Sequence, residues 1–184
     1  CTPSRAAFVS GQYPHETGAY SNNHHLKDEV VTFAALLKQQ GYATGYAGKW
    51  PLDGNGKPQW KPKRNFGFTD NRYMFNRGHS KKLTDTPQGP KVDTGTRPTY
   101  DVSGARPANW PTDWLANKTI DFIKANQSSP CVYMVSIPDP HGPDRVRAPY
   151  NNMYTGMKFK TPHTAGKSKK GVPSWAKPSG GGAN

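Results

Sequence analysis

The first residues of the chain combine a nucleophile with two features that favour an anion. Cys1 is followed by Pro3, whose fixed φ suits the first turn of a helix, and by the helix-forming run 6–9. The N–H groups at the start of such a helix attract an anion, and Arg5 adds a planar guanidinium suited to an oxyanion. The pattern predicts a reactive cysteine beside an anion site. The alternative is a buried cysteine followed by a helix that happens to carry arginine.

A lysine and a histidine each follow a predicted strand. Residues 42–48 are rich in aromatic and small side chains and predict a short strand, which ends just before Lys49. The apolar run 131–137 predicts a central strand covered on both faces, and His141 follows it between two prolines. Ligands collect at strand ends in open α/β sheets, so we expect both side chains to line a site. The alternatives are an exposed lysine after a glycine turn and a purely structural histidine.

Three segments, in this order, resemble the sequence signatures of the type I sulfatases. The first is Cys1-Thr-Pro-Ser-Arg followed by Ser10-Gly11, in which Ser10 stands where the family has threonine. Residues 41–52 are similar to the second signature, Gly-Tyr-x-Thr-x-x-x-Gly-Lys-Trp-His-Leu. Residues 140–143 resemble the Pro-His-x-Pro turn that follows a strand in the family. The resemblance covers roughly residues 1–150.

The resemblance implies roles for four residues. Cys1 is the precursor of formylglycine, whose hydrated aldehyde attacks the sulfur of a sulfate ester and whose second hydroxyl then allows elimination of the sulfate. Arg5 steadies this modified residue, and Lys49 provides a positive charge for a sulfate oxygen and the formylglycine hydroxyl. His141 binds a sulfate oxygen and can protonate the departing alcohol. The implied fold is the alkaline-phosphatase-like α/β sandwich, built on a large mixed sheet.

The resemblance also implies partners and a cofactor. The substrate is a sulfated polysaccharide or another sulfate ester, and a formylglycine-generating enzyme modifies Cys1. The family binds calcium, and from within this chain only the modified Cys1 is expected to contact the ion. A periplasmic or extracellular location is implied because many sulfated glycans are extracellular.

Pro51 departs from the family pattern, because it stands where the second signature has histidine. That histidine is the expected base that takes a proton from the hydrated aldehyde. Proline has no titratable group, and loss of such a base costs about 10²–10⁴-fold in rate. We expect a sulfuric ester hydrolase acting on a sulfated carbohydrate or an aryl sulfate. The alternatives are an impaired relative that binds sulfated glycans without turnover, and a phosphoester hydrolase of the same fold, which usually presents Ser or Thr instead.

The composition favours a polyanionic ligand. The 184 residues carry a formal net charge of +13, and no readout motif accompanies it, so nucleic acid is not expected as a partner. No apolar run approaches the roughly 18 residues of a membrane span. The two cysteines, Cys1 and Cys131, do not suggest a disulfide framework, and Cys131 is predicted to be a buried thiol. His15, His24 and His25 are interpreted as loop residues and not as metal ligands.

We interpret the chain as a piece of a longer protein that is inactive and binds calcium poorly by itself. It is expected to comprise part of a catalytic domain and a basic, Gly- and Pro-rich surface segment of the same domain. The predicted ranges are 1–156 for the former and 157–184 for the latter, with an irregular segment at 12–31 and loop-rich sequence at 53–111. Helices are predicted at 32–40, capped by Thr32, and at 111–125, capped by Thr112 and with Ile120 and Ile123 in the core.

Overall fold

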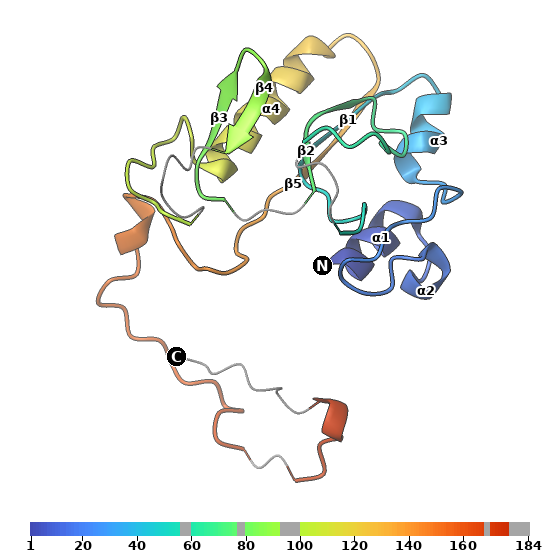
Figure 1. The fold of residues 1–184 in the computed structure, drawn as a ribbon. Helices are drawn as coiled ribbons and strands as arrows, with labels where there is room; N and C mark the ends of the chain where they lie inside the picture. The colour runs from blue at the N-terminus through green and yellow to red at the C-terminus, as the bar shows by residue number, and fades with distance from the viewer. Residues whose placement is uncertain (56–59, 77–79, 93–99, 168–169, 177–184) are drawn as a thin grey trace. The chain divides into compact units, whose positions relative to one another are not determined.

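The computed structural model describes residues 1–55, 60–76, 80–92, 100–167 and 170–176 (Figure 1). The chain divides into two units, Cys1–Asn152 and Met153–Asn184. The described side chains of the second unit are exposed except for Val172, and this unit contains one short 3-10 helix, η2 (Ser174–Ala176). The elements described next all belong to the first unit.

A three-stranded parallel sheet forms the centre of the first unit (Figure 1). Its strands are β1 (Ala43–Lys49) in the middle, β2 (Asp70–Phe75) on one side and β5 (Cys131–Ser136) on the other. The register of β1 and β5 runs without a shift from Ala43 opposite Cys131 to Gly48 opposite Ser136, so both strands end at the same edge. The class is therefore α/β, as the sequence predicts.

Helices cover both faces of this sheet. Tyr46 and Ala47 are adjacent in β1 and point to opposite faces. Tyr46 belongs to a buried cluster that includes side chains of α1 (Thr2–Ser10) and α3 (Phe33–Gln39). Ala47 belongs to a second cluster with Trp114 and Leu115 of α4 (Pro111–Ala125). The sheet is thus the middle layer between α1 and α3 on one side and α4 on the other.

The structure corrects two predictions of irregular sequence. The segment 12–31 contains a short helix, α2 (Pro14–Thr17), and the segment 53–111 contains β2 and an antiparallel hairpin of β3 (Leu83–Thr86) and β4 (Gly89–Val92). These strands are rich in Asp, Asn, Gly and Pro, which have low strand propensity. Pairing with β1, or across the hairpin, determines their structure instead of local propensity.

The predicted N-terminal cap is correct for α3 and wrong for α4. The Thr32 hydroxyl accepts a hydrogen bond from the Ala35 N–H at 3.2 Å, which confirms Thr32 as the cap of α3. In α4 the cap position is Trp110, and the Thr112 hydroxyl instead donates to Asp139 at 3.2 Å. Two side chains of α4 that were predicted as core, Ile120 and Ile123, are 46% and 51% exposed.

The prediction of a fully covered central strand is wrong for β5. Within the described residues β5 lies at the edge of the sheet, and only Ser136 of its six residues is buried. Cys131 is half-buried and is a free thiol. The strand covered on both faces is β1, in which Thr44–Lys49 are buried. No described helix is long and apolar enough to cross a membrane.

Candidate active site

Cys1 lies in the N-cap position of α1. The Arg5 N–H donates to the Cys1 carbonyl oxygen at 3.1 Å, which closes the first helical turn. The Cys1 side chain is exposed, whereas Thr2 is buried and its hydroxyl donates to the Pro51 carbonyl oxygen at 3.1 Å. This contact holds the start of α1 beside the segment that follows β1.

Asn22 caps α1 from outside the helix. Its Oδ1 accepts a hydrogen bond from the Thr2 N–H at 3.3 Å and lies 4.0 Å from Cys1 Sγ. The first N–H groups of a helix lack partners within the helix, and the Cys1 side chain makes no capping hydrogen bond to them. Asn22 therefore orients the backbone that carries the predicted nucleophile.

Arg5, Lys49 and Ser136 meet where β1 and β5 end. Arg5 Nη1 donates to the Ser136 hydroxyl, and this hydroxyl donates to the Lys49 carbonyl oxygen at 2.8 Å. The Tyr46 hydroxyl donates to the same carbonyl oxygen at 2.7 Å. Because Gly48 and Ser136 are paired in the sheet, residues 87 positions apart in the chain come together.

A glycine makes this close approach of the two strands feasible. A Cβ atom on Gly48 would lie 2.1 Å from the Ser136 carbonyl oxygen, and Gly48 has a φ of +102°. Both the space and the backbone conformation therefore exclude a side chain at this position. The glycine before Lys49 in the second signature is therefore required by the packing of β1 against β5.

The cluster of Arg5, Lys49 and Ser136 is positively charged and partly buried from solvent. The Lys49 side chain is almost fully buried, and this burial, with the Arg5 charge added, lowers its pKa to about 8. Burial raises the pKa of Tyr46, so its hydroxyl stays protonated and can donate. The guanidinium of Arg5 beside the Ser136 hydroxyl, with the Lys49 ammonium near enough to interact with the Arg5 charge, suits an oxyanion such as sulfate.

Pro51 is buried just beyond the end of β1. Its carbonyl oxygen accepts the hydrogen bond from Thr2, but its ring has no group that can transfer a proton. The position where the signature has histidine therefore offers no proton-transfer group here.

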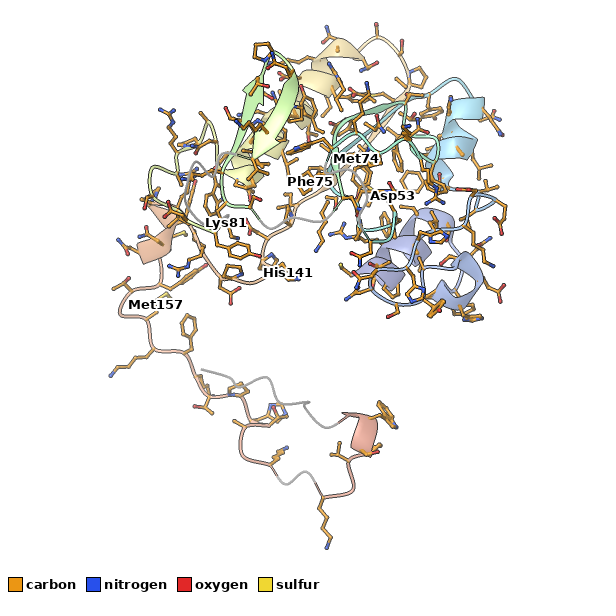
Figure 2. All side chains as sticks on the ribbon, viewed as in Figure 1. Asp53, Met74, Phe75, Lys81, His141 and Met157 are labelled. Carbon is orange, nitrogen blue, oxygen red and sulfur yellow. The ribbon has the colours of Figure 1, made fainter. Side chains whose placement is uncertain are left out.

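His141 lies on the loop that follows β5 and is exposed. Its Nδ1 is 2.9 Å from the Gly142 carbonyl oxygen. With Lys81 and Asp139 it lines a cavity of about 360 Å³ in the first unit; Figure 2 labels Lys81 and His141. Asp139 lies on the same loop, and its carboxylate contacts Lys81 Nζ and the Thr112 hydroxyl.

The structure therefore brings together some of the predicted site residues and separates another. The Arg5 side chain and the Lys49 backbone carbonyl are joined through the Ser136 hydroxyl, and Cys1 is one helical turn from Arg5. His141 instead lines the cavity, which contains none of these four residues.

Metal ligands are not gathered in the part of the chain that the structure describes. No group of three or more His, Cys, Asp or Glu residues there could hold a metal ion. Calcium takes about 6–8 oxygen ligands, whereas the side-chain oxygen in contact with Cys1 is that of Asn22. The described residues therefore do not by themselves supply the ligands of the calcium ion that the resemblance implies. His15 Nε2 lies 3.2 Å from Glu16 Oε1, and the His24 ring lies against the Tyr20 ring.

Sequence reasoning missed Ser136, Tyr46 and Asn22. Ser136 carries a signal, because a hydroxyl at the last position of an apolar strand lies at the edge where ligands collect. Tyr46 lies in the second signature but was given no role of its own. Asn22 has no local signal, since its contact with Thr2 spans 20 residues of loop and helix.

Comparison with known proteins identifies the family. A family model described as Sulfatase matches residues 1–169, so the chain belongs to the sulfatase family. An ulvan-active sulfatase of Formosa agariphila is 44% identical over 69 residues, which are 37% of this chain and 14% of that protein. The uncharacterized sulfatase YidJ of Escherichia coli is 25% identical over 171 residues, which are 86% of this chain and 32% of YidJ.

Solved structures share the fold. The structure of YidJ from Bacteroides fragilis superimposes with a TM-score of 0.62 at 19% sequence identity, over 85% of this chain and 37% of that one. That of Ps i-CgsB gives a TM-score of 0.61 at 24% identity, over 87% of this chain and 39% of that one. The expectation of an alkaline-phosphatase-like α/β fold is thereby confirmed. The chain spans about a third or less of the length of the relatives named above.

Proposed function

We propose that the protein is a sulfuric ester hydrolase that releases sulfate from a sulfated carbohydrate or an aryl sulfate. The observation that carries this proposal is the cluster of Arg5, Lys49 and Ser136 at the shared end of β1 and β5. Arg5 is one helical turn from Cys1 and donates to the Ser136 hydroxyl, and the buried ammonium of Lys49 adds a second positive charge that interacts with that of Arg5. Membership of the sulfatase family supports the same chemistry.

We assign each residue a part in this reaction, and the resemblance to the family supports the assignment. Lys49 and Arg5 attract the sulfate oxygens and offset the charge that develops on them. The positive end of the α1 helix dipole favours the same anion. His141, exposed on the loop after β5, protonates the departing alcohol. The formylglycine made from Cys1 by a formylglycine-generating enzyme supplies a hydrated aldehyde as nucleophile.

Other parts of the proposal rest on the family alone. Calcium is proposed as cofactor, with its main ligands outside this chain. A periplasmic or extracellular location is proposed together with a sulfated polysaccharide as partner. Residues 1–156 are proposed to belong to one catalytic domain, with 157–184 as its basic surface segment.

The first test is mass spectrometry of the full-length gene product, produced with a formylglycine-generating enzyme. We expect the peptide that begins at Cys1 to lose the mass that separates a thiol from an aldehyde, and the protein to release sulfate from an aryl sulfate. The Cys1→Ala variant should lose this activity, whereas Cys131→Ala, the matched control at the half-buried start of β5, should keep it. A plain thiol at Cys1 with retained binding of sulfated glycans would instead favour the non-catalytic alternative.

The second test concerns the missing base. If Pro51 impairs proton transfer, Pro51→His should raise kcat by about 10²–10⁴-fold. The Pro51→Ala variant is the control, because it restores an N–H without a titratable group. An equal gain in both variants would show that the proline backbone, and not the missing imidazole, limits the rate.

A further inference from the structure

The Ser136 hydroxyl has its hydrogen-bond directions determined by its partners. A hydroxyl has a single hydrogen to donate, and a guanidinium has donors only. Because Arg5 Nη1 must be the donor in its contact with Ser136, the hydrogen of Ser136 points to the Lys49 carbonyl oxygen, 2.8 Å away. Ser136 is 4% exposed, so water competes little for these bonds. The hydroxyl therefore presents a lone pair to Arg5.

The peptide group that anchors Ser136 is itself held on both sides. The Lys49 carbonyl oxygen accepts from the Tyr46 hydroxyl at 2.7 Å as well as from Ser136, and these two bonds use both of its lone pairs. The N–H of the same peptide group belongs to Trp50 and donates to the Phe75 carbonyl oxygen of β2 at 2.7 Å. Ser136 is thus bound to a point of the sheet that has little freedom to move.

Arg5 needs an anchor because it lies near a like charge. Burial and the Arg5 charge together lower the pKa of Lys49 to about 8, so the two cations interact. Before an anion binds, their repulsion favours positions of the long Arg5 side chain that are farther from Lys49. A hydrogen bond from Arg5 to a fixed hydroxyl opposes this repulsion and reduces the ordering that anion binding must otherwise supply.

The anchor of Arg5 is neutral, unlike the partners of other arginines. Three described arginines form ion pairs with carboxylates: Arg64 with Asp53, Arg72 with Asp70, and Arg147 with Asp113. A carboxylate holds a guanidinium in place but also offsets its charge. Arg5 donates to a hydroxyl instead, and burial raises the pKa of Tyr46, so the second hydroxyl of this network also stays neutral. The network therefore holds Arg5 without adding a negative charge.

We propose that Ser136 is a positioning residue that fixes the Arg5 guanidinium for anion binding without neutralising it, and that Tyr46 supports Ser136 through the Lys49 carbonyl oxygen. This inference rests on the proposed function and adds two residues to its anion site. Ser136 accepts from one N–H of Arg5, and the guanidinium has further N–H donors that can bind sulfate oxygens. Ser136 and Tyr46 therefore act on the anion through Arg5 and not by touching it.

The test is calorimetric binding of inorganic sulfate, at constant ionic strength, to the full-length protein with Cys1→Ala, so that the content of formylglycine does not vary. Ser136→Ala should weaken binding about tenfold, because it removes a hydrogen bond to a charged group. Ser136→Thr retains the hydroxyl and should bind within about threefold of the parent. Tyr46→Phe should weaken binding less than Ser136→Ala, because the Lys49 carbonyl oxygen still accepts from Ser136.

A double-mutant cycle separates positioning from a general loss of structure. If Ser136 acts through Arg5, Ser136→Ala should cause no further weakening in a protein that already carries Arg5→Met. Thr44→Val is the matched control, because it removes another buried hydroxyl of the sheet, which donates to the Gly67 carbonyl oxygen at 2.6 Å. This control should lower the Tm and leave sulfate binding unchanged.

The outcomes separate this inference from the proposed function. Unchanged sulfate binding in Ser136→Ala would overturn it, and so would the absence of sulfate binding by the parent protein. Equal weakening by Ser136→Ala with and without Arg5→Met, or an equal loss in Thr44→Val, would show a structural effect and also overturn it. A plain thiol at Cys1 without turnover would refute the hydrolase, whereas a loss in Ser136→Ala that depends on Arg5 would still support the positioning role.

Discussion

At the scale of single residues, Lys49 combines a charge with burial. Its side chain is 4% exposed, and burial together with the Arg5 charge lowers its pKa to about 8, from 10.5 in an unfolded chain. The folded protein therefore binds fewer protons than the unfolded chain between pH 8 and pH 10.5. In that interval stability rises with pH, and below it the cost of the buried charge is constant.

This difference predicts a pH dependence that belongs to Lys49. The Tm of the wild type should rise between about pH 8 and pH 9.5 relative to that of Lys49→Met, which has no titratable amine at position 49. The difference between the two Tm values removes the contribution of other groups that titrate there. Parallel Tm curves for both proteins, recorded by circular dichroism, would contradict a lowered pKa at Lys49.

The residues that carry a motif were accessible from the sequence, whereas those that complete the site were not. Cys1, Arg5 and Lys49 lie in the first two signatures, and the type and spacing of these residues suggest anion chemistry without any structure. Ser136 is joined to Arg5 across 131 residues, and Asn22 to Thr2 across 20. Such contacts depend on which strand lies next to which, and a local pattern does not contain that information.

At the scale of elements, Gly48 determines how closely β1 and β5 approach at the site. A Cβ on Gly48 would lie 2.1 Å from the Ser136 carbonyl oxygen, at a φ of +102°. Gly48→Ala should therefore lower the free energy of unfolding by at least about 2 kcal/mol, since strain and overpacking add. Urea denaturation measures this loss.

The matched control for this change is Gly104→Ala. Gly104 also has a positive φ, of +69°, but nothing lies within 4 Å of the position of an added Cβ. Its loss should be limited to the conformational cost of about 1–2 kcal/mol. Equal losses in the two variants would show that backbone conformation alone, and not the contact with Ser136, restricts Gly48.

Element prediction succeeded where local chemistry determines structure. The α3 helix has a threonine cap and the β1 strand has aromatic and small residues before a glycine, and both are present as expected. The β2 strand and the β3–β4 hairpin escaped prediction because Asp, Asn, Gly and Pro favour turns. Their strand conformation depends on partners far along the chain. The edge position of β5 has the same origin, because an apolar run does not reveal how many neighbours a strand has.

At the scale of the whole chain, the sequence alone predicts the fold class. The three signatures in order implied the family, and the family match over residues 1–169 bears this out. The net charge of +13 is unevenly distributed along the chain. Six of the 25 basic residues and none of the 12 acidic ones fall in the second unit, Met153–Asn184. Nearly half of the net charge therefore lies in 32 residues that have no carboxylate side chains to offset it.

This distribution predicts which lysines bind a sulfated polysaccharide. In the second unit each ammonium acts in a uniformly positive field, whereas in the first unit nearby carboxylates reduce the attraction within a Debye length of about 8 Å. Replacing four exposed lysines of the second unit with glutamine should lower the salt concentration for elution from heparin more than the same change in the first unit. The two sets are Lys158, Lys160, Lys167 and Lys170, and as control Lys38, Lys63, Lys91 and Lys124. Because both variants have the same net charge, equal shifts would show that total charge governs binding, and unequal shifts would place the polyanion on the second unit.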